Sequence, residues 1–252
     1  RICREIADPV AIGRALAGQA VVLSDRGRPS EALPLLDAYA DICRAEGDLR
    51  GLAEARLNGA AARFETGDVA GGATAAAEAE QLARGLGDPA LLTRVLVARA
   101  SAFAGLNDWP GVERYAREAE QLARGANLLS VAAVALGLLG TARREQGDLA
   151  GAHAAHTEEA ALADRAGDRV EAATAPAHLG NVAAAAQRWQ EALTHYNAAE
   201  PQLRALGAVG LLLPVLATRA QIHQLQQRLP QALADHADAP VLEIDVHAWH
   251  RR

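Results

Sequence analysis

The chain has 252 residues, of which 50% are hydrophobic, 22% are charged and only 3% are aromatic. The apolar residues are mostly Ala, Leu and Val, which favours helices over a compact α/β or all-β domain, because such domains need more aromatic and β-branched residues. The formal net charge is −6, and the Arg residues form no dense basic run, which excludes the electrostatic footprint of a nucleic-acid-binding surface.

Turn signals recur along the chain at a constant interval, and a second series lies midway between the members of the first. Gly or Asn suits the left-handed end of one helix, and a following Asp suits the N-cap of the next. The first series is Gly27-Arg28, Gly67-Asp68, Asn107-Asp108, Gly147-Asp148, Gln187-Arg188 and Gln227-Arg228, and the second is Gly47-Asp48, Gly87-Asp88, Asn127-Leu128, Gly167-Asp168 and Gly207-Ala208.

These signals predict one helix between each signal and the next, and two helices joined by a tight turn pack antiparallel. At the start of the chain, Ile2-Cys3-Arg4 repeats as Ile42-Cys43-Arg44, so residues 1–7 are expected to be the tail of an earlier helix in a longer array. The first helices of the repeats are predicted at 9–26, 49–66, 89–106, 129–146, 169–186 and 209–226, and the second helices at 29–46, 69–86, 109–126, 149–166, 189–206 and 229–239.

Small residues recur where neighbouring helices must approach closely. One series lies in the first helices and another lies twelve positions later in the second helices. The members are Ala20, Ala60, Ala100, Gly140, Gly180 and Ala220, followed by Ala32, Gly72, Val112, Ala152, Ala192 and Ala232. In this spacing the chain resembles the tetratricopeptide-repeat family in a 40-residue form, over about residues 2–239. The resemblance implies an all-α, right-handed superhelical solenoid of about six antiparallel helix pairs.

The chain departs from the family pattern in two ways. The large aromatic near the start of each first helix is absent, and its positions hold Leu16, Arg56, Leu96, Leu136, Pro176 and Leu216. Pro176, Pro201 and Pro214 fall inside predicted helices, where a proline removes a backbone hydrogen bond, so repeats five and six are expected to be the least regular. After Pro240 the pattern stops, and residues 240–252 are predicted to form an irregular tail or cap, with strand-like alternation at 241–246.

The resemblance implies that the first helices line a concave face, which suits an extended peptide or a helix as ligand. The candidate binding residues on this face are Arg14, Glu54, Asn58, Phe64, Arg94, Ser101, Thr141, Arg144, His178, Asn181 and Gln221. Some tetratricopeptide domains grip a C-terminal carboxylate with Asn and basic residues at positions such as Asn58 and Arg94. Because the companion positions are small or apolar, the favoured interpretation is that Asn58 binds the backbone of the adjacent helix.

No catalytic, cofactor-binding or metal-binding residue is predicted. His153 and His156 lie near Glu159 at a spacing that zinc could use, but no Cys or third His is nearby in the sequence. The favoured interpretation is a solvated convex face, and His247 and His250 in the tail receive the same interpretation.

The cysteines and two of the tryptophans are interpreted as structural. Cys3 and Cys43 occupy equivalent positions, but stacked helices lie too far apart for a normal disulfide, so both are expected to be small buried residues. Trp109 and Trp189 each follow a turn and are expected to pack that turn onto the preceding helix. The sequence contains no phosphate-binding Gly loop and no nucleophile elbow.

The leading hypothesis is a non-enzymatic scaffold that binds a protein or peptide through its concave face. The resemblance implies a cytoplasmic interaction or sensor segment of a larger bacterial regulatory protein, in signal transduction or transcription regulation, as in signal-transducing ATPases. The alternative is a sensor for a small ligand or signalling peptide that controls a separate effector domain. Self-association through uncapped solenoid ends is a further alternative. No cofactor, nucleic-acid partner or membrane contact is predicted.

Overall fold

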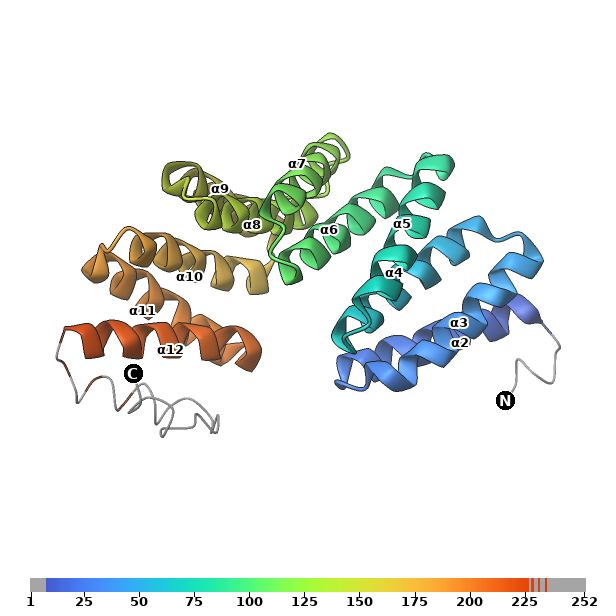
Figure 1. The fold of residues 1–252 in the computed structure, drawn as a ribbon, viewed down its shortest axis with the longest axis horizontal. Coiled ribbons are helices and arrows are strands. Elements are labelled where there is room, and N and C mark those ends of the chain that lie inside the picture. Colours follow the sequence, from blue (N-terminus) through green and yellow to red (C-terminus); the bar gives the residue numbers. More distant parts are fainter. Residues whose placement is uncertain (1–7, 227, 229–230, 232–233, 235–252) are drawn as a thin grey trace. The chain divides into compact units, whose positions relative to one another are not determined.

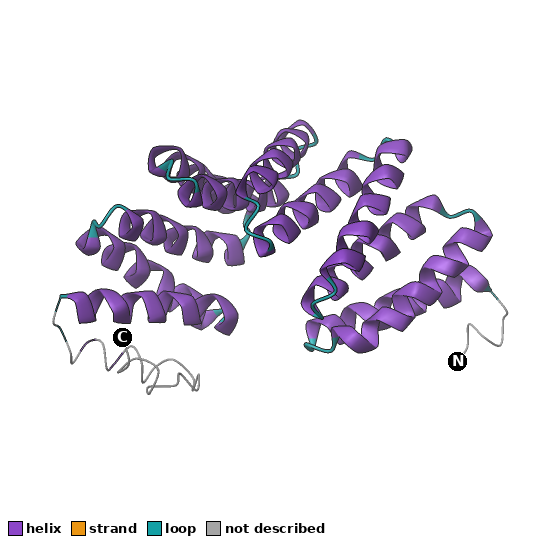
Figure 2. Cartoon of the chain, viewed as in Figure 1, coloured by secondary structure: helices purple, strands orange, loops and turns teal. Residues whose placement is uncertain are grey.

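The computed structural model describes residues 8–226 together with 228, 231 and 234, and this part of the chain contains helices and short turns but no strand (Figure 2). The helices are α2 (Pro9–Asp25), α3 (Pro29–Glu46), α4 (Leu49–Glu65), α5 (Val69–Leu86), α6 (Pro89–Gly105), α7 (Trp109–Gly125), α8 (Leu129–Glu145), α9 (Leu149–Ala166), α10 (Arg169–Ala185), α11 (Trp189–Ala205) and α12 (Val209–Leu225). None of these described helices combines the length and apolarity that a membrane span requires.

The predicted helices between residues 9 and 226 are confirmed, and each ends within one residue of its predicted end. The expectations for residues 1–7, for a helix at 229–239 and for the tail at 240–252 lie outside the described residues, apart from 231 and 234.

The turn chemistry explains these boundaries. The carboxylate of Asp148 accepts a hydrogen bond from the backbone N–H of Gly151 at 2.8 Å, which caps the start of α9. The turn residue that precedes the N-cap adopts a positive φ, for example +85° at Gly147 before α9 and +58° at Gln187 before α11. The same Asp cap recurs at Asp48, Asp68, Asp88, Asp108 and Asp168.

Consecutive helices pack on one another from α2 to α7 and from α9 to α12, and the first helices of adjacent repeats also meet, as α4 meets α6 (Figure 1). The small residues lie where the helices touch: Ala60 and Ala100 are fully buried. At Gly180 a Cβ atom would lie 2.6 Å from the ring of Tyr196. Helix α10 therefore approaches α11 more closely than a residue with a Cβ at position 180 would allow. The small-residue series therefore sets the helix spacing, as the sequence predicts.

The chain divides into two compact units, residues 1–142 and residues 143–252, which are treated separately below. In the first unit a core cluster joins Leu57, Leu91 and Val95 across α4 and α6. In the second unit the core is built around Tyr196 and Leu216, and Trp189 packs against it.

In the described helices of repeats five and six, the internal prolines do not interrupt the helix. Pro176, Pro201 and Pro214 lie inside α10, α11 and α12, each of which runs for 17 residues. Each proline removes one hydrogen bond, whereas the apolar side chains that each helix buries against its neighbours stabilise the whole helix. Tertiary packing therefore outweighs the local preference.

Candidate functional site

A groove of about 340 Å³, open to solvent, crosses three first helices of the first unit. Its lining residues come from α4, α6 and α8 in three short runs, each spanning about one helical turn. The lining residues are Leu57, Asn58, Ala61, Arg94, Val97, Ala98, Ser130, Val131 and Val134.

The groove runs obliquely across the repeats. Val97 occupies the position of Leu57 in the next repeat, but the lining on α6 already begins almost one turn earlier, at Arg94. From α6 to α8 the lining shifts by about one further turn, to Ser130. The lining thus moves about one helical turn towards the N-terminus in each successive helix. A ligand in this groove would contact a different turn of each helix.

The groove is mainly apolar with three polar side chains. Leu57, Val97, Val131 and Val134 supply branched apolar surface, and Arg94 is the only charged side chain among the lining residues. Arg94 is exposed, and within the described residues its side chain forms no ion pair or hydrogen bond. A guanidinium group of this kind is available to a carboxylate of a ligand.

Asn58 also lies in the groove, which brings together the two residues that the carboxylate-grip hypothesis pairs. The favoured interpretation of Asn58 is wrong, since its side chain forms no hydrogen bond to the backbone or to any other described residue. Asn58 therefore presents a donor and an acceptor to whatever occupies the groove.

The other candidates of the first unit lie outside this groove. Glu54 pairs with Arg50 at 3.5 Å, and Phe64 packs against a cluster of buried alanines on α4 and α5. Arg14 lines a separate small pocket beside Cys43, which is a buried free thiol as expected. Ser101 is exposed and Thr141 is half-buried. Cys3 lies outside the described residues.

The candidates of the second unit mostly interact within the protein. Arg144 pairs with Glu145 at 2.7 Å. The hydroxyl of Tyr196 donates a hydrogen bond to the side-chain oxygen of Asn181 at 2.7 Å. His178 hydrogen-bonds with Glu159, as described below. Gln221 is exposed.

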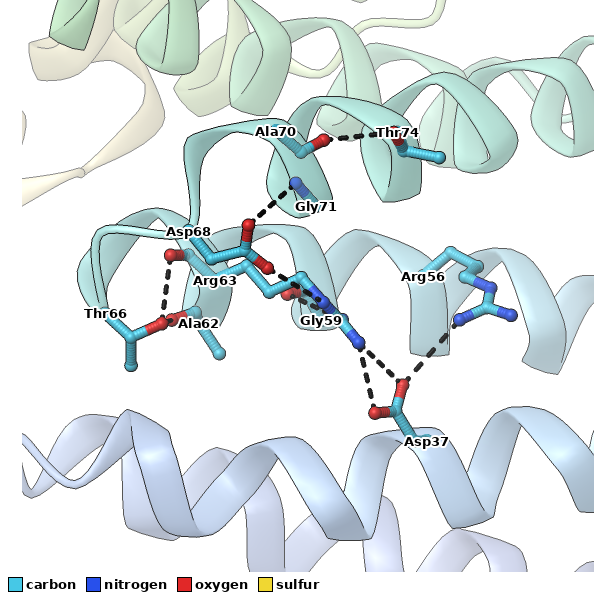
Figure 3. A network of polar contacts seen from close by, with 10 residues as sticks. All are labelled: Asp37, Arg56, Gly59, Ala62, Arg63, Thr66, Asp68, Ala70, Gly71 and Thr74. Carbon is cyan, nitrogen blue, oxygen red and sulfur yellow. Dashed lines mark hydrogen bonds and ion pairs between the residues drawn. The ribbon is translucent and has the colours of Figure 1, made fainter.

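Arg56 shows how the chain replaces one of the missing aromatic residues. Its guanidinium group pairs with Glu78 at 2.7 Å and with Asp37 at 3.7 Å. Arg63, two turns later on α4, reaches the same Asp37 at 2.9 Å and also approaches Asp68 at 3.9 Å (Figure 3). These ion pairs connect α4 with α3, with α5 and with the turn between α4 and α5, so this polar network is structural.

A buried polar cluster joins α9 and α10 in the second unit. The Nδ1 atom of His156 lies 2.6 Å from the carboxylate of Glu159, and the Nδ1 atom of His178 lies 2.9 Å from the same carboxylate. His156 is 1% exposed and Glu159 is fully buried. The interpretation of His156 as part of a solvated face is therefore wrong, although His153 is exposed as expected. His247 and His250 lie outside the described residues.

The cluster contains titratable groups with shifted pKa values. Burial opposes ionisation of Glu159, but hydrogen bonds from both histidines outweigh it and hold the Glu159 pKa below its usual range. Burial lowers the pKa of His156, because it disfavours the charged imidazolium. At His178, burial acts in the same direction, but the contact with Glu159 outweighs it and raises the pKa. Burial, aided by the charge of Glu159, raises the pKa of Glu171 to about 7.

The roles of Glu171 and of His178 in this cluster do not follow from the sequence pattern. Of the groove-lining residues, only Asn58 and Arg94 are among the candidates from the sequence, and the repeat register does not point to Ser130 and Val131. The Glu159–His178 contact joins residues 19 positions apart on different helices, so no local spacing in the sequence indicates it. The two groove residues follow from the oblique shift, which the repeat register alone does not contain.

The fold matches solved helical-repeat structures. Aspartyl phosphate phosphatase F from Bacillus subtilis superposes with a TM-score of 0.76 over 92% of this chain, at 13% identity. The chain has a tetratricopeptide-like fold. The apo form of RapI gives 0.77 over 94% of this chain and 85% of its own, at 10% identity.

The tetratricopeptide-like array also matches part of a signal-transduction ATPase with a tetratricopeptide repeat sensor from Pyrococcus horikoshii, with a TM-score of 0.69 over 92% of this chain at 13% identity. The chain spans 60% of the length of the Bacillus subtilis phosphatase and 37% of the length of this ATPase. No protein-family model and no curated protein matches the sequence.

Proposed function

We propose that the chain is a binding scaffold whose groove across α4, α6 and α8 holds an extended peptide segment of a partner protein. The observation that carries the proposal is the pairing of Arg94 and Asn58 in one open, mainly apolar groove, with neither side chain engaged by the rest of the described protein. Apolar side chains of the segment would fill the space between the valines, and a carboxylate would bind Arg94.

An open groove supports a peptide over a small ligand, because a small-molecule site encloses most of the ligand surface. The oblique course over three helices also suits a chain-like ligand. A solved structure that covers 89% of this chain, at 11% identity, is a Rap protein complexed with Competence and Sporulation Factor, so a protein of this fold does bind such a factor.

We further propose that this array is part of a larger cytoplasmic regulatory protein of a bacterium. In this proposal the array covers about residues 1–239 and is followed by a tail at 240–252. The tetratricopeptide repeat sensor of the Pyrococcus horikoshii ATPase supports the sensor part of this proposal. In this view the groove reports the presence of the partner segment, and the array itself performs no catalysis.

The test selects peptides with free C-termini from a random library and measures their affinity for the wild type, Arg94→Ala and Asn58→Ala. Loss of a charged hydrogen-bond partner is expected to weaken binding by roughly 10-fold to 100-fold in Arg94→Ala. Ala61→Trp, which fills the groove from an exposed position, should abolish binding.

Arg117→Ala is the matched control, because it removes the same charge from an exposed position on α7, where Arg117 pairs with Glu113 away from the groove. Its affinity should equal that of the wild type. Comparison of each peptide with its C-terminal amide shows whether Arg94 binds the terminal carboxylate or an acidic side chain. Peptides that bind Arg94→Ala and Ala61→Trp as tightly as the wild type would overturn the proposal.

A further inference from the structure

The buried cluster between α9 and α10 contains a set of donor atoms without parallel in the rest of the described array. His156 and Glu159 lie one turn apart on α9, and His178 faces them from α10. One ligand atom from each of the three side chains lies within 4.8 Å of the other two. The rings of His156 and His178 have centroids 4.8 Å apart. Three donors thus converge on one point from two rigid helices.

The repeat itself shows that the fold does not require polar residues at these positions. The residues one repeat before and one repeat after each member of the cluster occupy the same place in neighbouring repeats, and none of them is a His, Asp or Glu. The matching residues are Ala116 and Tyr196 for His156, Ala119 and Ala199 for Glu159, and Leu138 and Thr218 for His178. The three donors therefore occur together at a single junction of the array.

The donors are costly to bury without a compensating interaction. Glu159 is fully buried, and its only ion-pair partners within the described residues are the two imidazoles. A buried ionic group of this kind is often no more stable than apolar residues of similar size. Since the neighbouring junctions are packed with apolar or small residues, stability alone gives no reason for this substitution.

We propose that His156, Glu159 and His178 bind a divalent transition-metal ion of the zinc type. Two imidazole nitrogens and one carboxylate oxygen form a donor set that zinc uses when it keeps a further position open. Imidazole ligands disfavour magnesium and calcium, which prefer oxygen. The remaining coordination position would go to water or to Glu171, which lies two turns before His178 on α10 and interacts with Glu159.

Metal binding requires the three side chains to rotate within the cluster. Metal–nitrogen and metal–oxygen bonds of about 2.0–2.2 Å separate neighbouring ligand atoms by about 3.3 Å in a tetrahedral site. Here the Nδ1 atoms lie 2.6 Å and 2.9 Å from the nearer carboxylate oxygens. One ligand atom from each side chain lies within 4.8 Å of the other two, so side-chain rotations must bring the two imidazole nitrogens and one carboxylate oxygen to about 3.3 Å from one another around the ion. Each Nδ1 proton then moves to Nε2 or to solvent. The side chain of His178 is 25% exposed, which provides the route of entry.

The test uses the chelator-treated protein and titrates it with Zn²⁺ by calorimetry and with Co²⁺ by visible absorption, since Co²⁺ reports a tetrahedral site spectroscopically. One ion per chain is expected. His178→Ala and Glu159→Gln should weaken binding by at least roughly 100-fold, because each removes a ligand. His153→Ala, at an exposed position one turn before His156, should bind as the wild type does.

A triple variant keeps the proposal testable if single variants fail to fold. H156A/E159A/H178L places the residues of the α7–α8 junction at the α9–α10 junction, so it should remain helical and should bind no ion. The proposal is overturned if the wild type binds no ion, or if the triple variant binds as tightly as the wild type. Loss of binding in His153→Ala would overturn it as well, since that result would assign the ion to surface histidines.

Discussion

At the scale of single residues, the array depends on positions where a side chain is missing. Gly180 on α10 lies against the ring of Tyr196, which is fully buried and donates its hydroxyl hydrogen to Asn181. Burial raises the pKa of Tyr196 to about 12, which agrees with a phenol held in an apolar core. The close contact allows Tyr196 to reach Asn181, so packing and hydrogen bonding at this junction depend on each other.

Gly180→Ala is therefore expected to lower the free energy of unfolding by about 1–3 kcal/mol, because the new Cβ would lie 2.6 Å from the Tyr196 ring. Gly210→Ala is the control, since that glycine is helical and has no other atoms within 4 Å of an added Cβ. It should raise stability by about 0.5–1 kcal/mol. Urea denaturation followed by circular dichroism measures both. An equal gain in both variants would show that the tight contact at Gly180 has no energetic consequence.

At the scale of the element, helix ends are set by paired signals in the turns. A residue with positive φ ends one helix, and in most turns an Asp side chain caps the next. Gln187 adopts this left-handed conformation, with a φ of +58°, although it is neither Gly nor Asn, and Arg188 supplies no side-chain cap to α11. The α10–α11 turn is therefore strained relative to the Gly147-Asp148 turn one repeat earlier.

Gln187→Gly should relieve this strain and raise the free energy of unfolding by about 1 kcal/mol, because a left-handed conformation costs a residue with a Cβ about that much. Ala186→Gly is the matched control, since Ala186 has a φ of −80° and gains nothing from glycine. The control should lose up to about 1 kcal/mol. Thermal and urea unfolding measure the change in the free energy of unfolding of both variants. A loss of stability in Gln187→Gly would contradict the strain argument.

At the scale of the whole molecule, contacts join helices that are close in sequence. Consecutive helices pack together from α2 to α7 and from α9 to α12, and the next contacts join the first helices α2 with α4 and α4 with α6. Stability in such an array is close to a sum of local terms, so damage at one repeat should remain near that repeat. The groove belongs to the first compact unit and the His–Glu cluster to the second, so each proposal can be tested without disturbing the other site.

Leu96→Ala tests this locality. Leu96 is fully buried in α6, and its truncation is expected to cost about 2–5 kcal/mol. Hydrogen exchange measured by mass spectrometry should become faster in α5, α6 and α7 and remain unchanged in α10, α11 and α12. Leu106→Ala, at a position 49% exposed just after the same helix, should leave exchange unchanged. Uniformly faster exchange in Leu96→Ala would mean that the whole chain unfolds as one cooperative unit.

The sequence by itself determined the period, the helix boundaries and the presence of Asn58 and Arg94 on first helices. Caps and left-handed turn residues act on their immediate neighbours, so their spacing carries this information directly. Asn58 and Arg94 lie in the groove because the repeat register places both on first helices.

The tertiary structure alone decided which side chains meet between helices. The oblique shift that adds Ser130 to the groove, and the meeting of Glu159 with His178, depend on how neighbouring helices cross. The physical reason is that a one-dimensional period fixes each helix face, whereas the contact between two faces depends on their crossing angle and on the rotamers that packing selects.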